Sequence, residues 1–166
     1  MNPDADEATQ ERSLRFRNAM ASFPSGVTIV TTADEAGAWQ GFTATSFCSV
    51  SADPPLVLVC LARSAQCHPT FMDVPKWIIN IVRSGHAELA QRFATGGADK
   101  FVEGHFTANA DGLPVLDKAM VVLECEAYAR YGGGDHTILV GRVTDSHVGD
   151  DAPAIYFRRD YHSLPF

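Results

Sequence analysis

The apolar run from Leu56 to Ala62 constrains the fold of this chain more than any other sequence feature. It follows the turn Asp53-Pro54-Pro55 and is far shorter than the roughly 20 residues that a transmembrane helix needs. A continuous apolar segment of this length, bounded by turn formers, is typical of a β-strand buried on both faces. We therefore expect Leu56–Ala62 to form the centre of the hydrophobic core.

Other segments also have the composition of strands, because they are rich in β-branched residues or alternate between apolar and polar residues. The full set of expected strands is Val27–Thr32, Ala38–Ser46, Leu56–Ala62, Lys76–Val82, Val121–Ala129, His136–Val148 and Ala154–Phe157. These strands do not alternate regularly with long helices, which disfavours a doubly wound parallel sheet. The sequence therefore predicts a mainly β fold with a mostly antiparallel sheet, and closure into a barrel would remove the sheet edges.

Two or three short helices are expected at the periphery of the sheet. In the first, Phe16, Ala19, Met20 and Phe23 recur at helical spacing, which indicates a helix that docks one face before the stop signal Pro24-Ser25-Gly26. The others are a helical turn near residues 68–72 and an amphipathic helix over residues 87–94. Residues 1–10 are polar and acidic and are expected to form a flexible tail, with residues 11–166 forming a single domain.

Composition narrows the classes of partner. Thirteen Lys and Arg against twenty Asp and Glu give a formal net charge of -7, so nucleic acid is not an expected partner. No segment has the length of a membrane span, and the acidic start lacks a signal peptide's basic and apolar regions, so a cytoplasmic location is expected. The four cysteines show no C-x-x-C spacing and the six histidines no metal-like spacing, so we expect reduced thiols and no metal.

Known nucleotide motifs are absent, and one polar segment stands out instead. No G-x-G-x-x-G or G-x-x-x-x-G-K-[ST] occurs, and Gly132-Gly133-Gly134 is read as a hairpin turn because no helix follows it. Residues Gln40 to Ser51 carry two threonines and three serines in an otherwise apolar, strand-like segment. Their hydroxyls can bind a ring edge or a phosphate, although a polar strand face explains the same letters. The long segment from Gly96 to Gly112 is rich in turn formers and is expected to border a site.

Taken in order, several segments resemble the flavin reductase family whose members are the small component of two-component flavin-dependent monooxygenases. The matching segments are FRNAMASFPSGVTIVTT, GFTATSFCSVSADPPLVLVCL, WIINIV, HAELAQRFA, GLPVLDKAMVVLECE, GGGDHTILVGRV and YFRRDYH. The resemblance spans nearly the whole chain. It implies a split β-barrel that forms a homodimer, and an NAD(P)H:flavin oxidoreductase that reduces FAD or FMN and supplies reduced flavin to a partner monooxygenase.

The resemblance also implies which residues contact the cofactors. The flavin-binding set is Thr43, Ala44, Thr45, Ser46, Ser49, Cys60, Leu61, Ala62, Arg63, Ser64, Gln66, Asn80, Lys100, Phe101 and Arg158. Within it, Arg63, Ser64 and Gln66 are expected nearest the flavin phosphate, and Asn80 is expected to brace the flavin-binding strands. His136, in the Gly-Asp-His motif, is the residue expected beside the nicotinamide, where its imidazole can bind the carboxamide or the phosphates.

Alternatives stay open at this stage. A flavin carrier or sensor with the same barrel would turn over no nicotinamide, and an oxidase of the pyridoxamine phosphate type would need more basic residues around its substrate. Arg63 and Lys100 also suit solvated surface charges, and His136 suits a hairpin edge. The sequence leaves undecided the choice between FAD and FMN, that between NADH and NADPH, and the identity of the monooxygenase.

Overall fold

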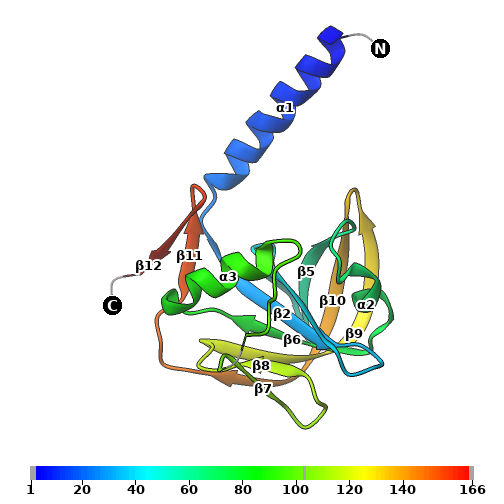
Figure 1. Cartoon of the computed structure of the whole chain (residues 1–166), viewed down its shortest axis with the longest axis vertical. Coiled ribbons are helices and arrows are strands. Elements are labelled where there is room, and N and C mark those ends of the chain that lie inside the picture. Colours follow the sequence, from blue (N-terminus) through cyan, green and yellow to red (C-terminus); the bar gives the residue numbers. More distant parts are fainter. Residues whose placement is uncertain (1–2, 103, 165–166) are drawn as a thin grey trace.

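The computed structural model describes residues 3–102 and 104–164 and consists mainly of antiparallel β-sheet with few helices (Figure 1). The largest sheet has seven strands in the order β3-β2-β6-β9-β10-β5-β4, and every neighbouring pair is antiparallel. Their bounds are β2 Thr28–Ala33, β3 Trp39–Ala44, β4 Cys48–Ala52, β5 Pro55–Ala62, β6 Lys76–Ile81, β9 Val121–Gly133 and β10 His136–Val148. The predicted mainly β, mostly antiparallel fold is confirmed.

The sheet is strongly curved, but its ladder of paired strands is open. Strands β3 and β4 are the two edges, yet only residues 45–47 separate them in the chain, so these edges must approach each other at one end. Among the strands that the structure describes, no ladder pairs β3 with β4. A strictly closed barrel is therefore not what this sheet forms.

The centre of the core differs from the expected one. In β5 the burial alternates: Val57, Val59 and Leu61 are buried, whereas Leu58 and Cys60 are only half-buried. The strands buried on both faces are β2 and β6 instead. The threonines make β2 look less apolar in the sequence than a strand buried on both faces. They are buried all the same, because their hydroxyls donate to the carbonyl oxygens of Ala44, Pro114 and Lys76.

Helices α2 (His68–Asp73) and α3 (Ala87–Ala94) and the 3-10 turn η1 (Ser84–His86) cover parts of the sheet. Phe71 of α2 packs into one buried cluster with Trp77 of β6 and Leu139 of β10. Leu89, Ala90 and Phe93 of α3 form the second cluster, on the other face of β2. The predicted amphipathic helix over residues 87–94 is confirmed, with the same bounds.

Helix α1 (Pro3–Ala21) departs from expectation in two ways. It begins at Pro3, well before residue 10, and it projects away from the sheet with the N-terminus at its far end (Figure 1). The face predicted to dock is exposed: the relative accessibilities are 64% for Phe16, 55% for Met20 and 69% for Phe23. Docking of this face against the rest of this chain is thus wrong: Phe16 and Met20 border a groove with Thr45 and Tyr156 but stay exposed.

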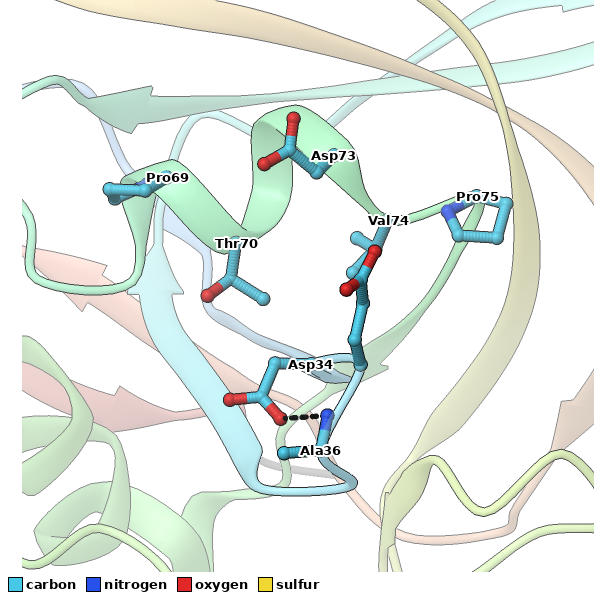
Figure 2. Close-up of a pocket in the computed structure, with 8 residues that line it drawn as sticks. Asp34, Ala36, Pro69, Thr70, Asp73, Val74 and Pro75 are labelled. Atoms are coloured by element: carbon cyan, nitrogen blue, oxygen red, sulfur yellow. Dashed lines mark hydrogen bonds between the residues drawn. The ribbon is translucent and has the colours of Figure 1, made fainter.

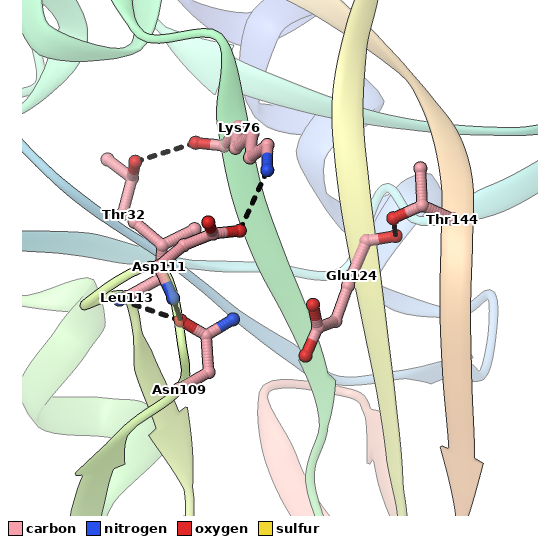
Figure 3. Close-up of polar contacts among 7 residues, drawn as sticks. All are labelled: Thr32, Lys76, Asn109, Asp111, Leu113, Glu124 and Thr144. Atoms are coloured by element: carbon pink, nitrogen blue, oxygen red, sulfur yellow. Dashed lines mark hydrogen bonds and ion pairs between the residues drawn. The ribbon is translucent and has the colours of Figure 1, made fainter.

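The segment between α3 and β9 contains a short hairpin, β7 (Phe106–Ala108) with β8 (Pro114–Leu116), that the sequence did not predict. Figure 3 shows how its turn is fastened to β6: Lys76 Nζ lies 2.8 Å from Asp111 Oδ2, and the Asn109 side chain accepts from the Leu113 amide. The remaining strands, β1 (Ser25–Gly26), β11 (Ala154–Phe157) and β12 (Asp160–Ser163), form a small sheet at the base of α1. All four cysteines are free.

Candidate functional site

A cavity of about 540 Å³ lies between the β2–β3 turn and α2 (Figure 2). Carboxylates of Asp34, Glu35 and Asp73 border it, and Asp34 Oδ1 accepts from the amides of Ala36 and Ala38 to shape the turn. None of the predicted site residues lines this cavity, and an acidic rim opposes binding of an anionic flavin phosphate or dinucleotide. Size alone therefore does not identify the site.

A second cavity of about 350 Å³ lies where β3, β5, β10 and the end of α3 meet, and we call it the β5–β10 cavity. Its lining includes the predicted residues Thr43, Cys60, Leu61, Ala62, Ser64, Gln66, Lys100 and His136. Phe42, Leu61 and Phe93 contribute apolar surface to its lining, and Lys100 contributes a cation. An apolar surface beside a few polar groups and one cation suits a planar ring that carries a phosphate.

Strand pairing brings His136 to this cavity from far along the chain. His136 begins β10 and pairs with Ala62 at the end of β5, and the Arg63 amide donates to the Asp135 carbonyl at 2.9 Å. His136 Nδ1 lies 2.7 Å from Asp135 Oδ1. The hydrogen bond from His136, and then its charge, hold the pKa of the Asp135 carboxyl below its usual value.

Two side chains fasten the loop after α3 over the cavity. Gln66 Oε1 accepts from the Gly97 amide at 3.2 Å, and Lys100 Nζ donates to the Gly41 carbonyl at 3.0 Å. Gln66 and Lys100 also border an adjoining cavity of about 210 Å³, which Phe101 helps to line. From the segment Gly96–Gly112 that was expected to border a site, Gly96 and Lys100 line the β5–β10 cavity.

Several predicted hydroxyls and amides are engaged in holding the fold. Thr43 Oγ1 donates to the Ala90 carbonyl at 2.6 Å, and Ser46 Oγ accepts from the Cys60 amide at 2.9 Å. Asn80 is fully buried: Nδ2 donates to the Ile29 carbonyl and Oδ1 accepts from the Leu116 amide, both at 2.9 Å. Asn80 thus joins β6 to β2 and β8 and does not reach the cavity.

Other predicted residues lie away from the β5–β10 cavity. Ala44 is buried in the core, Ser49 is exposed on β4, and Thr45 borders a separate groove beside α1. The Arg63 guanidinium lies against Gly132, where a Cβ would be 3.0 Å from its Nη2. Arg158 follows β11 with a φ of 50°, and its guanidinium lies over the Phe157 ring, 5.2 Å from the centroid.

The sequence reasoning missed Phe42, Ala65 and the end of α3 as lining residues. The signal was present for Phe93 and Ala94, because they end the segment HAELAQRFA that resembles the family. Within residues 3–102 and 104–164, no cluster of three or more His, Cys, Asp or Glu side chains forms a metal site. Across the same residues no helix is long and apolar enough to cross a bilayer.

Comparison with known proteins adds an independent result. Residues 20–165 match the family model of the flavin reductase like domain. The NADH:riboflavin 5'-phosphate oxidoreductase of Streptomyces pristinaespiralis is 41% identical over 151 residues, covering 89% of this chain and 86% of that protein.

Two solved structures superpose closely on this fold. The NADH:FAD oxidoreductase of Streptomyces globisporus C-1027, in complex with NAD and FAD fragments, gives a TM-score of 0.87 at 29% identity, over 93% of this chain and 94% of the other. The flavin reductase component of a bacterial two-component tryptophan halogenase gives 0.86 at 29% identity, over 93% and 99%.

Proposed function

The chain belongs to the flavin reductase-like domain family, and on that premise we propose that the β5–β10 cavity binds the flavin that it reduces. The protein is an NADH-dependent flavin reductase that acts on FMN or FAD. The observation that supports this placement is the gathering of residues from β3, β5, β10 and the loop after α3 around one partly apolar cavity with a cation. We propose further that NADPH can replace NADH as the reductant.

We assign roles to the cavity residues from their chemistry. The backbone of Cys60, Leu61 and Ala62 and the side chain of Thr43 form the wall for the ring, while Ser64, Gln66 and Lys100 are the donors for the phosphate and ribityl groups. When bound, the flavin supplies the acceptor atom for the nicotinamide hydride. The protein needs no nucleophile for this step, because its residues act by binding and orienting both rings and by excluding water.

We make a separate proposal for the predicted residues that lie outside the β5–β10 cavity. Thr45, Ser46, Ser49, Arg63 and Arg158 lie on the surface next to strands β4, β5 and β11. A long ligand such as FAD extends well beyond a cavity of about 350 Å³, so these residues are candidates for its distal portion.

We also propose that the protein is a homodimer. On β5 the side chains of Leu58 and Cys60 face away from the core and are half-buried, and Ile138 of β10 pairs with Cys60 beside them. A groove of about 470 Å³ next to α1 is lined by apolar side chains that include Leu14, Phe16 and Met20. Large apolar side chains that are exposed next to one another, as Leu14, Phe16 and Met20 are, favour an interface, and a second copy of the chain presents the same side chains in return.

Steady-state assays test the function directly. Purified protein is expected to oxidise NADH when FMN or FAD is added, and to pass the reduced flavin to a flavin-dependent monooxygenase supplied in trans. Tight flavin binding without NADH oxidation would instead identify a carrier or sensor. Light scattering during size-exclusion chromatography tests the dimer, and a monomer at all concentrations would contradict it.

Variants test the placement of the flavin. Lys100→Ala is expected to raise the flavin KM roughly tenfold, since it removes the cation from the cavity. Arg63→Ala is also expected to raise the flavin KM, but by less, because its guanidinium lies outside the cavity against Gly132. Unchanged flavin KM in Lys100→Ala would contradict the proposed site.

A further inference from the structure

His136 reaches the β5–β10 cavity with one ring nitrogen already engaged. Its Nδ1 lies 2.7 Å from Asp135 Oδ1, within the range of a strong charge-assisted hydrogen bond. The side chain of His136 is partly exposed at the cavity, whereas Asp135 lies on the solvent side. The imidazole therefore has one nitrogen, Nε2, left for a ligand.

The fold holds this pair in place through the backbone on both sides. The Asp135 carbonyl accepts from the Arg63 amide at 2.9 Å, and His136 is in register with Ala62 on one side and Gly133 on the other. Gly134 makes the preceding turn with a φ of +67°, a conformation that suits glycine. The pairing of β10 with β5 and β9 fixes the backbone of His136, and the Arg63 amide holds that of Asp135 in the turn before it, so the two side chains leave the hairpin next to each other.

An ionised carboxylate accepts hydrogen bonds and cannot donate them, so the proton of a neutral His136 must lie on Nδ1. An aspartate carboxyl is ionised at neutral pH, and this hydrogen bond holds the pKa of Asp135 lower still. Nε2 then carries a lone pair and acts as an acceptor. An acceptor binds an N–H donor, and it repels a phosphate oxygen.

We propose that Asp135 is a positioning residue that fixes His136 as the Nδ1–H tautomer, so that Nε2 accepts from the carboxamide N–H of the reduced nicotinamide. The proposal rests on the proposed function and decides between the two partners that a histidine at this place could bind, an amide or a phosphate. Asp135 itself touches neither substrate nor flavin.

Nitrogen NMR of the resting protein tests the tautomer without any turnover. Long-range proton–nitrogen correlation at about pH 8, where a free imidazole is neutral, distinguishes the protonated ring nitrogen from the bare one. We expect protonated Nδ1 in the wild type and in Asp135→Asn, whose amide oxygen still accepts, and a mixture in Asp135→Ala. The opposite tautomer in the wild type, or no change in Asp135→Ala, would overturn the proposal.

Kinetics with a substrate analogue tests what Nε2 recognises. In reduced 3-acetylpyridine adenine dinucleotide a methyl group replaces the carboxamide NH₂, so the donor is lost. The preference for NADH over this analogue in kcat/KM is expected to fall roughly 3- to 10-fold in Asp135→Ala relative to the wild type, the size of one hydrogen bond, and to be retained in Asp135→Asn. Comparing preferences within each variant cancels the different redox chemistry of the analogue.

The control is Asp111→Ala, which removes an exposed carboxylate that pairs with Lys76 away from the cavity, and it should keep the wild-type preference. An unchanged preference in Asp135→Ala, in a protein that oxidises NADH, overturns the recognition by Nε2 and leaves the proposed function intact. A wild-type protein that oxidises no NADH with any flavin overturns the proposed function, and the recognition with it.

Discussion

Helices α1 and α3 have similar apolar spacing in the sequence, but the apolar face is exposed in α1 and buried in α3. Leu89, Ala90 and Phe93 of α3 are buried against the sheet, whereas Phe16 and Met20 of α1 are exposed. Helix α3 is much the shorter of the two. Helical periodicity therefore predicts that a helix has an apolar face. It does not predict which surface, in the same chain or in another, packs against that face.

The two helices are therefore expected to stabilise different states: α3 the folded single chain, and α1 the dimer. Helix α3 contributes to the folding of the single chain, because its contacts lie within it. Helix α1 has its apolar face free in the described part of the chain, and we assign that face to the second copy of a dimer. Four predictions break or sharpen this division.

The largest effect is expected from Phe93→Ala. Phe93 is buried on α3 and packs against Phe101 and Phe106, so its removal leaves a cavity in the core. The free energy of unfolding should fall by about 3–5 kcal/mol. Phe16→Ala on α1 is the matched control and should change monomer stability by less than about 0.5 kcal/mol. Urea denaturation at several protein concentrations separates unfolding from dissociation, and equal losses in the two variants would break the division.

A pH effect is expected at the N-terminus of α3. Burial, and then the charges of Arg83 and His105, lower the pKa of His86 to about 4 from 6.5, against a smaller opposing effect of Asp151. Folding therefore favours the neutral ring, and this stability is present above about pH 6.5 and is lost as the pH falls toward about 4. The loss should be on the order of 3 kcal/mol.

The measurement is the free energy of unfolding against pH for the wild type and for His86→Gln. The variant is expected to show a shallower slope between these two pH values. Parallel curves would mean that His86 is not held neutral by the packing of η1 and α3.

A smaller effect on the free energy of unfolding is expected where α3 packs against β3. A Cβ on Gly41 would lie 2.8 Å from Phe93 Cε1 and 2.9 Å from the Val30 carbonyl oxygen, which cannot move without shifting β2. Gly41→Ala should therefore cost about 1–3 kcal/mol of stability. Gly26→Ala, after α1, meets nothing within 4 Å and should be nearly neutral. A melting temperature of Gly41→Ala equal to that of Gly26→Ala would refute the tight seating of Phe93.

The smallest effect per side chain is expected on α1. Replacing Phe16 of α1 and Phe23, just after its end, together with Ser should raise the dimer Kd roughly 5- to 30-fold, about 1–2 kcal/mol, while leaving the unfolding of the monomer unchanged. Analytical ultracentrifugation measures the Kd. An unaltered Kd would show that α1 is not part of the interface.

The sequence predicted the candidate site unevenly. Cys60, Leu61 and Ala62 of β5 and Ser64 and Gln66 of the turn after it line the cavity, although Arg63 does not, because a strand and its following turn stay together in any fold. Asn80 and Ala44 matched the family motif equally well but are buried elsewhere, since their role depends on which strands pair with β6 and β3. Phe42, next to the predicted Thr43, was missed because the prediction rested on the hydroxyl-bearing residues of this segment, whereas Phe42 is an apolar residue of the core that also lines the cavity.

By itself, the sequence determined where most of the longer strands occur, the antiparallel class of the fold and the family, because alternation and turn chemistry act over a few neighbouring residues. It missed the short strands β4, β7 and β8. Only the tertiary structure decided that β2 and β6, and not β5, are buried on both faces, that His136 meets Ala62, and that α1 stays uncovered. Burial and pairing depend on segments far apart in the chain, and no local pattern encodes which of them will meet.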